Sequence, residues 1–478
     1  MFTEADIVRI ESELFRRSFR DFVIAGWSTF NAHPLILERP QEALIAVLQA
    51  VGDGRFGNTY DILLNVCPGH GKTSILTAFE AWVWARDPSE SMIVASHTQD
   101  FANKKGQEFQ DLVNSKFYQS HFNVKLKTDT VQSMKNSHNG VRDCTGTNGS
   151  VTGLHYGIQI CDDLIDAKRA DAPNLIAAAN AWLDKTLGSR WRAGTMPRRI
   201  FINQRIAVGD VTDHVKSNPR SPIYQLVLPV IATDVKSRIA DAKDEVVWED
   251  DRKPGDILAP KLFPQAFIDG ARKQMGSITF NAQFMQAPIT LTSGITDPAW
   301  LQHTYDIAPT FDKIVMVVDT AITGKADPIA LLTAGIVGSK AYLLDLVNAN
   351  YTQLQTITQI EELEKRYHYD EIVIERAPTG VTLVDILSQT RANVVGISPG
   401  SKSKLERYRT ACIALESGSV LFPNNSDFDH AKELILAFPN PAIHDEVVDT
   451  LAYLIHRYLL RQPEDIQAIT AGMMQLLD

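Results

Sequence analysis

The feature that most constrains this chain is a glycine-rich stretch, residues 67–74 (Cys-Pro-Gly-His-Gly-Lys-Thr-Ser), which directly follows a run of apolar residues. The apolar run, residues 62–66, predicts a buried strand, and residues 73–86 have the pattern of a helix. A strand, a glycine-rich turn and a helix in this order are typical of a phosphate-binding loop, because glycines let backbone N–H groups converge on an anion at the positive end of the helix. The stretch therefore predicts a nucleotide site.

This loop supplies most of the predicted nucleotide ligands. The Lys72 ammonium would neutralise the β- and γ-phosphates, and the Thr73 hydroxyl would coordinate Mg²⁺. Val66 stands where the usual pattern has its first glycine, so an ordinary strand-to-helix turn is the alternative. The nucleotide-binding residues predicted in the loop are Pro68, Gly69, His70, Gly71, Lys72, Thr73 and Ser74.

A second β-prone run, residues 156–165, contains the paired carboxylates Asp162 and Asp163. In a nucleotide-hydrolysing site, the first acid of such a pair holds the Mg²⁺ and the second polarises the attacking water. We therefore predict that Asp162 binds metal and nucleotide and that Asp163 is catalytic; two solvated acids at a strand end are the alternative. Gln204 and Arg205 end a further predicted strand and are expected beside the γ-phosphate; a surface salt bridge is the alternative.

The N-terminal segment, residues 1–58, has a mainly helical pattern. Gln41 or His33, both ahead of the phosphate loop, could contact an adenine ring. An exposed or helix-capping side chain is the alternative for each residue.

A second domain is predicted to begin near residue 305. Residues 313–319, 329–337 and 340–346 read as three strands, and a helix and a fourth strand, residues 371–375, follow them. Three strands, a helix and a strand are the opening order of a ribonuclease H-like fold, in which the first and fourth strands lie side by side.

Four carboxylates mark a predicted metal site in this second domain. Asp319 and Glu375 end the first and fourth strands, while Asp445 and Asp449 share one face of a helix. Carboxylates that converge repel one another unless divalent cations neutralise them. Two Mg²⁺ or Mn²⁺ ions there would activate a water and stabilise the leaving oxygen of a phosphodiester. Asp327, on a predicted loop, is a weaker candidate.

Composition limits how the chain can meet nucleic acid. The net charge is −10, and residues 301–478 hold 14 Lys and Arg against 23 Asp and Glu. An acidic chain is a poor general binder of DNA, so contacts must use bridging metal or a local basic patch. Residues 402–409 form such a basic run, for which a solvated helix face is the alternative.

Other global features point to a protein of the cytoplasm. No apolar run is long enough to span a membrane, and the first residues lack the pattern of a signal peptide. Four scattered cysteines without metal-like spacing predict free thiols in a reducing compartment.

Taken together, these motifs resemble those of the large terminase subunit of tailed bacteriophages, which packages DNA and cuts it. The phosphate loop is similar to the Walker A motif of that family, which also lacks the first glycine. Gln204 replaces the usual Thr of the coupling segment. The resemblance is carried by residues 67–73, 149–153, 160–163, 204–210, 280–288, 319–321, 374–375, 422–423 and 444–449.

The resemblance implies an α/β chain in which a P-loop ATPase domain of the additional-strand, conserved-glutamate (ASCE) type precedes a ribonuclease H-like nuclease domain. It also implies ATP with one Mg²⁺ (or Mn²⁺) at the first site and two such ions at the second. An arginine from a neighbouring subunit would reach the γ-phosphate. Arg142 is the candidate, with Arg190 and Arg192 as alternatives. The domains expected are residues 1–58 (helical lid), 59–235 (ATPase core), 236–304 (linker or peripheral subdomain), 305–462 (nuclease) and 463–478 (tail).

The implied function is ATP-driven translocation of double-stranded DNA into a procapsid, with cleavage of concatemers by two-metal hydrolysis. The implied partners are double-stranded DNA, the portal protein of the procapsid and a small terminase subunit, in the host cytoplasm. The chain itself is expected to be a monomer in solution and to form a pentameric ring with other copies when assembled. No membrane is among the expected partners. A helicase-nuclease of repair or defence and a non-catalytic DNA-binding or interaction protein are the alternatives.

Overall fold

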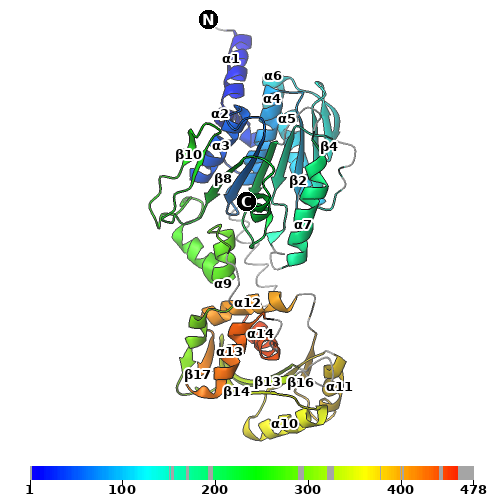
Figure 1. Cartoon of the computed structure of the whole chain (residues 1–478), viewed down its shortest axis with the longest axis vertical. Coiled ribbons are helices and arrows are strands. Elements are labelled where there is room, and N and C mark those ends of the chain that lie inside the picture. Colours follow the sequence, from blue (N-terminus) through cyan, green and yellow to red (C-terminus); the bar gives the residue numbers. More distant parts are fainter. Residues whose placement is uncertain are drawn as a thin grey trace. The chain divides into compact units, whose positions relative to one another are not determined.

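A computed structural model describes residues 3–149, 151, 155–167, 172–191, 198–288, 295–319, 328–376, 378–398, 400, 403–440 and 445–460. The described residues form two compact units (Figure 1). The first contains residues up to 271 and residues 278–288, and the second contains residues 272–277 and those from 295 onwards. The expected peripheral segment, residues 236–304, is thus shared between the two units. The expected tail, residues 463–478, lies outside the described residues.

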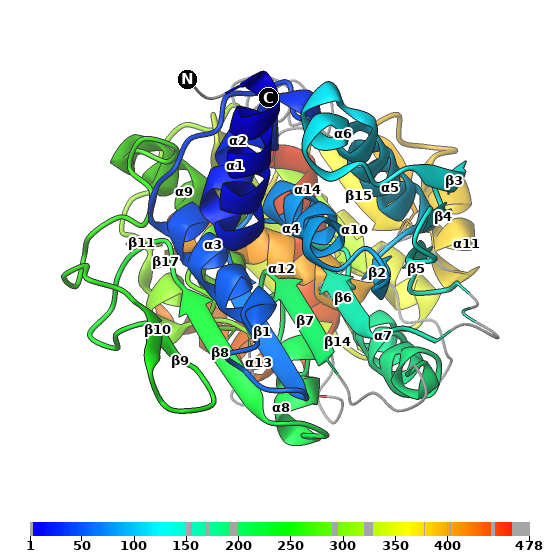
Figure 2. The same ribbon diagram turned by 90° about the horizontal axis from the view of Figure 1, so that it is seen from above.

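The first unit is built on an eight-stranded sheet. Its strands are β1 (Tyr60–Val66), β2 (Ser91–Ser96), β3 (Leu126–Thr130), β4 (Ser133–Asn136), β5 (Val141–Gly146), β6 (Ile158–Asp162), β7 (Arg198–Asn203) and β8 (Ile223–Leu228). Their order is β3-β4-β5-β2-β6-β7-β1-β8. The last six strands in this order, which are β5, β2, β6, β7, β1 and β8, are parallel to one another. The strands β3 and β4 extend the sheet at the β5 edge and are antiparallel. Figure 2 shows β8, β1, β7 and β6 side by side.

The position of β7 defines the type of P-loop fold. It lies between β1, which leads into the phosphate loop, and β6, which ends in the paired acids. An additional strand at this position is what the predicted ASCE-type fold requires. All seven residues of β1 are buried, as expected for a parallel strand covered on both faces. The first half of the predicted fold class is confirmed.

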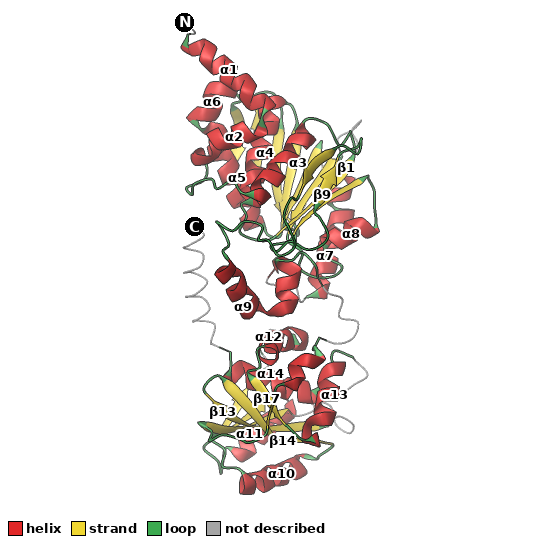
Figure 3. Cartoon of the chain, turned by 90° about the vertical axis from the view of Figure 1, so that its left-hand side faces the viewer, coloured by secondary structure: helices red, strands yellow, loops and turns green. Residues whose placement is uncertain are grey.

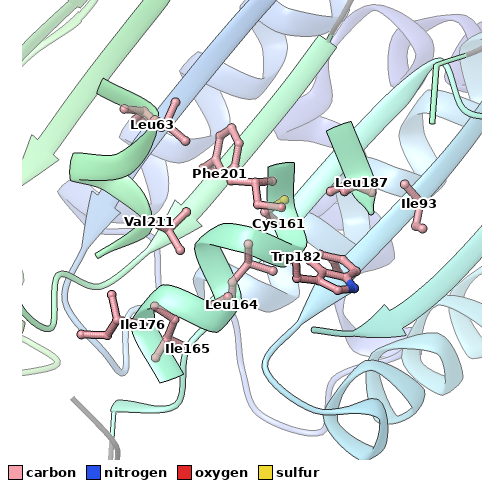
Figure 4. Close-up of a cluster of buried hydrophobic side chains, with 14 of the residues drawn as sticks. Leu63, Ile93, Cys161, Leu164, Ile165, Ile176, Trp182, Leu187, Phe201 and Val211 are labelled. Carbon is pink, nitrogen blue, oxygen red and sulfur yellow. The ribbon is translucent and has the colours of Figure 1, made fainter. Parts of the chain in front are cut away.

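Helices cover the faces of this sheet (Figure 3). They are α1 (Glu4–Arg17), α2 (Phe19–Gly26), α3 (Arg39–Gly52), α4 (Lys72–Arg86), α5 (Gln99–Asn114), α6 (Lys116–Phe122), α7 (Pro173–Lys185) and α8 (Val211–Ser217), with the short 3-10 helices η1 (Trp27–Thr29) and η3 (Leu187–Ser189). One core cluster joins Trp182 of α7 and Val211 of α8 to Leu63, Cys161 and Phe201 of three central strands (Figure 4). This packing holds the carboxyl ends of β1, β6 and β7 together.

The rest of the first unit is peripheral. A small antiparallel sheet pairs β9 (Arg238–Ala240) with β10 (Val246–Glu249). The helix α9 (Gln265–Gln283) is kinked at Gly276, where φ is +71°.

The second unit is built on a seven-stranded sheet. Its strands are β11 (Thr304–Tyr305), β12 (Lys313–Asp319), β13 (Ile329–Val337), β14 (Lys340–Ala349), β15 (Glu371–Glu375), β16 (Val394–Ile397) and β17 (Val420–Pro423). They are ordered β11-β17-β14-β13-β12-β15-β16. The strands β12, β13 and β14 form an antiparallel meander, and β15 lies parallel to β12. This is the strand order of a ribonuclease H-like fold, so the second half of the predicted fold class is also confirmed.

The two faces of this sheet carry different helices. They are α10 (Gln353–Arg366), α11 (Pro378–Leu387), α12 (Lys404–Glu416), α13 (Asp429–Ala437) and α14 (Glu446–Tyr458), with η4 (Pro298–Gln302) and η5 (Ser426–Phe428). Met316 and Val318 of β12 pack with Ile360 of α10. Because side chains alternate along a strand, Val317 and Asp319 point to the opposite face, where α14 packs on β12 and β13. Asp319 therefore faces the helix that begins at the other predicted acids.

Two further expectations concern the whole chain. In the part of the chain that the structure describes, no helix combines the length and the apolar character needed to cross a membrane. The four cysteines, Cys67, Cys144, Cys161 and Cys412, are buried free thiols.

Candidate functional site

The predicted phosphate loop connects the end of β1 to the start of α4. Gly69 and Gly71 have φ angles of +79° and +67°, a left-handed conformation that glycine adopts without steric cost. A Cβ atom on Gly69 would lie 2.6 Å from the Phe263 ring. Gly71 is the N-cap residue of α4 and makes no side-chain cap, so the first N–H groups of this helix can bind an anion. Pro68 and Ser74, at the two ends of the loop, are half-buried.

The side chain of His70 turns into the protein. Its imidazole is fully buried, and its centroid lies 4.6 Å from that of Phe263. Burial lowers the pKa of His70 to about 4, so the ring is neutral. The predicted nucleotide contact at this position can therefore come only from the backbone. The His70 carbonyl accepts a hydrogen bond of 2.9 Å from Gln41 Nε2, while the Gln41 side-chain oxygen caps α3. Gln41 thus has the capping role given as its alternative, and His33 is exposed.

The loop lysine and threonine contact the paired acids at the end of β6. Lys72 Nζ lies 2.9 Å from Asp163 Oδ2 and donates to the Val66 carbonyl at 3.4 Å. The Thr73 hydroxyl donates to Asp162 Oδ1 at 3.2 Å. The sequence places these residues 89 or more positions apart, and the parallel sheet brings them together. A hydroxyl and a carboxylate so close to a free helix N-terminus are the groups that would hold the Mg²⁺ of a bound nucleotide.

The buried carboxyl of Asp162 fits this assignment. Burial raises its pKa to about 7, and the negative charge of Asp163 adds to the rise, while Lys72 and the Thr73 hydroxyl lower it. A carboxyl that is costly to ionise in the ligand-free protein is stabilised as a carboxylate by a divalent cation. The donor set of Thr73 and Asp162 therefore suits Mg²⁺.

Asp163 is held in an unusual backbone conformation, with φ of +44°. Its Oδ1 accepts a hydrogen bond from the Gln204 backbone N–H at 3.0 Å, and its carbonyl oxygen lies 3.2 Å from Nδ1 of His97. His97 follows β2, the neighbour of β6, and was not among the predicted site residues. Its place just after the apolar residues 92–95 was the signal that could have found it, because the carboxyl ends of parallel strands meet at one edge of a sheet.

Gln204 and Arg205 have different places. Gln204 reaches Asp163 through its backbone, as described above. The Arg205 guanidinium instead binds both carboxylate oxygens of Asp210, at 2.9 and 3.1 Å, and Oδ1 of Asp213 at 2.7 Å. The predicted nucleotide contact of Arg205 is thus replaced by ion pairs within its own loop and α8.

The prediction for Arg142 is wrong. Arg142 lies on β5 and is 0% exposed, and its Nε donates to Glu80 Oε2 at 2.8 Å. Its guanidinium carbon lies 5.2 Å from the centroid of the Phe109 ring. A side chain enclosed in this way cannot enter the nucleotide site of a neighbouring subunit. Of the two alternatives, Arg190 is half-buried and Arg192 lies outside the described residues.

The second predicted site begins with two adjacent strand ends. Val318 of β12 is paired with Ile374 of β15, so the next residues, Asp319 and Glu375, are neighbours. Burial raises the pKa of Asp319 well above its usual value, and a hydrogen bond with Glu375 and the charge of Asp449 add to the rise. The carboxyl groups of Asp319 and Glu375 therefore lie within hydrogen-bonding reach of each other.

Asp445 and Asp449 lie at the start of α14 and face a lysine. Lys404 Nζ lies 2.8 Å from Asp445 Oδ1 and 2.7 Å from Asp449 Oδ2. An Nη atom of Arg407 lies 3.0 Å from Asp449 Oδ1. Asp449 is only 3% exposed, and burial raises its pKa while Lys404 lowers it. The negative charge of this pair is thus balanced by side chains of α12.

The four acids do not form a ready metal site here. Among the described residues, no three His, Cys, Asp or Glu side chains are grouped so that they could hold one metal ion. Asp319 is within electrostatic reach of Glu375 and of Asp449, and Lys404 binds both Asp449 and Asp445. The expected convergence of all four acids on two ions is therefore not seen in this arrangement. Asp327 lies outside the described residues.

The basic run at residues 402–409 lies beside the acids of α14. Lys404 is exposed and binds both Asp445 and Asp449, and Arg407 is buried with its guanidinium 4.9 Å from the Tyr453 ring centroid. Arg409 is half-buried, and Lys402 lies outside the described residues. Lys404 and Arg407 thus neutralise the acid cluster, and a DNA contact of this run stays a prediction.

Similarity to known proteins is found among solved structures. No protein-family model matches the sequence, and no curated protein matches it. The chain is similar in structure to the large terminase from the thermophilic bacteriophage D6E in complex with ATP-gamma-S, with 11% identity, a TM-score of 0.46 and coverage of 89% of this chain and 100% of that chain. It is also similar to the HK97 bacteriophage large terminase, with 15% identity, a TM-score of 0.36 and coverage of 87% and 92%.

A third similar structure covers one part of the chain. It is the large terminase nuclease from thermophilic phage G20c with bound magnesium, with 14% identity, a TM-score of 0.27 and coverage of 34% of this chain and 99% of that chain. The first two of these solved structures are large terminases of bacteriophages, and the third is the nuclease of one.

Proposed function

We propose that the chain is a large terminase subunit, which hydrolyses ATP to move double-stranded DNA into a procapsid and cuts concatemeric DNA in the host cytoplasm. The observation that carries this proposal is the pair of contacts between the phosphate loop and the acids of β6. Lys72 lies on Asp163 and Thr73 lies on Asp162, at a free helix N-terminus.

In the proposed hydrolysis, the Lys72 ammonium leaves the Asp163 carboxylate and binds the phosphates of ATP. The incoming phosphates attract its ammonium away from Asp163, which frees Asp163 Oδ2 to accept a proton from the attacking water. The Gln204 N–H keeps the other oxygen of Asp163 in place. Thr73 and Asp162 would hold the Mg²⁺, which supplies positive charge to the phosphates.

We place the proposed nuclease activity at Asp319, Glu375, Asp445 and Asp449. They gather on one face of the second sheet and at the start of α14, and oxygen donors of this kind suit Mg²⁺ or Mn²⁺. In this arrangement Lys404 supplies positive charge to Asp445 and Asp449. The proposed count of two ions follows from the resemblance alone.

The partners are proposed on the same basis. They are double-stranded DNA, a portal protein, a small terminase subunit and further copies of this chain in a pentameric ring. An arginine of a neighbouring copy would complete the nucleotide site, and Arg190 and Arg192 are the candidates left after the correction at Arg142.

The test measures ATP hydrolysis by the purified full chain with and without duplex DNA, together with strand displacement on a partly duplex substrate. We expect ATP turnover that rises with duplex DNA and no strand separation. Unwinding of the duplex would favour a helicase-nuclease. Absence of both hydrolysis and nucleotide binding would favour a non-catalytic protein and would overturn the proposal.

A further inference from the structure

Gln286 has a backbone conformation that its side chain does not favour. The described non-glycine residues with positive φ are Asn123, Asn139, Asp163, Asp244 and Gln286. Asn and Asp adopt this region because their short side chains bond to the local backbone, whereas Gln has no such preference. Residues in this conformation persist only where the surroundings hold them, and they gather at functional sites. Gln286 is therefore the position whose conformation calls for a reason.

Both polar atoms of the Gln286 side chain form hydrogen bonds with backbone groups. It is 4% exposed, and its Oε1 accepts the Arg205 N–H at 2.8 Å. Its Nε2 donates to the Gln283 carbonyl. Gln286 thus holds one N–H group of the segment that follows β7.

The N–H group next to it in the chain holds the catalytic acid of the proposed ATPase. Gln204 N donates to Asp163 Oδ1 at 3.0 Å, and Arg205 N donates to Gln286. The consecutive backbone N–H groups of Gln204 and Arg205 therefore link Asp163 to Gln286. A shift of this segment that broke the Gln286 bond would also move the donor that orients Asp163.

A small open pocket lies against this segment, and Asp163, Asn203, Gln204 and Thr212 are among its lining residues. Without Gln286, the Arg205 N–H would be a donor without its acceptor.

We propose that Gln286 is a positioning residue of the nucleotide site. It fixes the Arg205 amide and through it the neighbouring Gln204 amide, which sets the carboxylate of Asp163 for the attacking water. Gln286 acts through this segment and has no role in binding phosphate or Mg²⁺. The inference rests on the proposed ATPase function and assigns one further residue to it.

The first test compares steady-state ATP hydrolysis by the full chain and its variants. Gln286→Leu keeps the size of the side chain and removes both hydrogen bonds, so kcat is expected to fall roughly 10- to 100-fold, because small displacements of a catalytic group have effects of this size. KM for ATP is expected to stay within about twofold, since the phosphate loop is untouched. Gln286→Glu keeps the acceptor for the Arg205 amide and is expected to recover most of kcat. Gln265→Leu, at an exposed glutamine that begins α9, is the matched control.

The second test needs no catalysis and uses hydrogen exchange of the same full-length proteins. In the wild type, the Gln204 and Arg205 amides are expected to be protected from exchange. In Gln286→Leu, these amides are expected to exchange at least roughly tenfold faster, because the hydrogen bond from the Arg205 N–H to Gln286 no longer opposes local opening of the segment. The amides of β7 itself should keep their protection. Faster exchange throughout β7, or a rise in KM that matches the fall in kcat, would show a merely structural role and overturn the inference.

The same measurements distinguish failure of the proposed ATPase function from failure of the inference about Gln286. If the wild-type chain neither hydrolyses ATP nor shows slower exchange of the phosphate loop with nucleotide, the ATPase proposal falls whatever Gln286 does. If the wild type does both, and Gln286→Leu keeps its kcat and its exchange pattern, the inference alone is wrong. If Gln286→Leu does not fold, the test uses Gln286→Glu. The inference would also be overturned if Gln286→Glu showed wild-type exchange but a kcat as low as that of an Asp163→Asn variant.

Discussion

Both candidate sites hold a lysine against carboxylates, but in different surroundings. In the first unit, the Lys72 side chain is 7% exposed and lies 2.9 Å from Asp163. In the second unit, the Lys404 side chain is 50% exposed and lies between Asp445 and Asp449, at 2.8 and 2.7 Å. The first lysine belongs to a site shaped for an anion, with a free helix N-terminus beside it. The second belongs to a site rich in carboxylates, which suits a cation.

The difference teaches that one kind of ion pair can have opposite relations to a ligand. At the phosphate loop, the ligand and Lys72 attract each other, so the lysine is part of the binding site. At the acid cluster, a divalent cation and Lys404 compete for the same oxygens. The same type of substitution should therefore weaken ligand binding in one unit and strengthen it in the other.

The largest expected effect is at Lys72. We expect Lys72→Ala to lower ATP turnover at least about 10³-fold, because the γ-phosphate loses its main source of positive charge. Hydrolysis assays measure this, and Lys104→Ala, at an exposed lysine, is the control. Nicking of plasmid DNA with Mn²⁺ should be unchanged, since the acids lie in the other unit. Loss of both activities together would contradict the separation of the two sites.

A slightly smaller effect is expected at Asp319. Asp319→Asn should lower DNA cleavage at least about 10²-fold, as expected when one group that stabilises the transition state is lost. ATP turnover should stay at the wild-type level. Because asparagine can still hydrogen-bond to Glu375, the unfolding temperature should change little, which thermal denaturation measures. Cleavage by Asp319→Asn at the wild-type rate would remove this acid from the proposed site.

The smallest effect distinguishes the two lysines most sharply. Lys404→Met should tighten Mn²⁺ binding about tenfold, because one positive charge no longer competes for Asp445 and Asp449. Calorimetric titration of the full chain without nucleotide measures this. Lys365→Met is the control, since Lys365 pairs only with the exposed Glu362 on a distant helix face. Unchanged or weaker Mn²⁺ binding would mean that Lys404 does not compete with the cation.

The phosphate loop could be predicted well because its information is local. Gly69, Gly71, Lys72 and Thr73 stand within a few positions of one another, and their roles follow from backbone geometry and charge. The strand order of the second unit could be predicted for a similar reason. Its hairpin, its helix and its fourth strand are visible as separate apolar runs, so Asp319 and Glu375 could be placed on neighbouring strands before the structure was known.

Pairings between distant segments could not be predicted. Arg142 lies in a polar stretch, and nothing local shows that β5 turns it inward to Glu80 of α4, 62 residues away. The basic run near Lys404 could not be assigned to Asp445, 41 residues away, because a run of cations also fits a DNA contact or a solvated face. Gln286 lies in residues 280–288, which carry part of the resemblance, but nothing local shows its role, since that role depends on a backbone amide 81 positions earlier.

The pairing of β12 with β15 has a consequence for how this protein can change. Side chains alternate between the faces of a strand, so deleting one residue from β15 would carry Glu375 to the face covered by α10 and away from Asp319. The hairpin turn at Gly338 is exposed and can gain or lose residues without moving either carboxyl. Variation in length among functional descendants of this sequence should therefore gather in such turns and avoid the short strand that leads to Glu375.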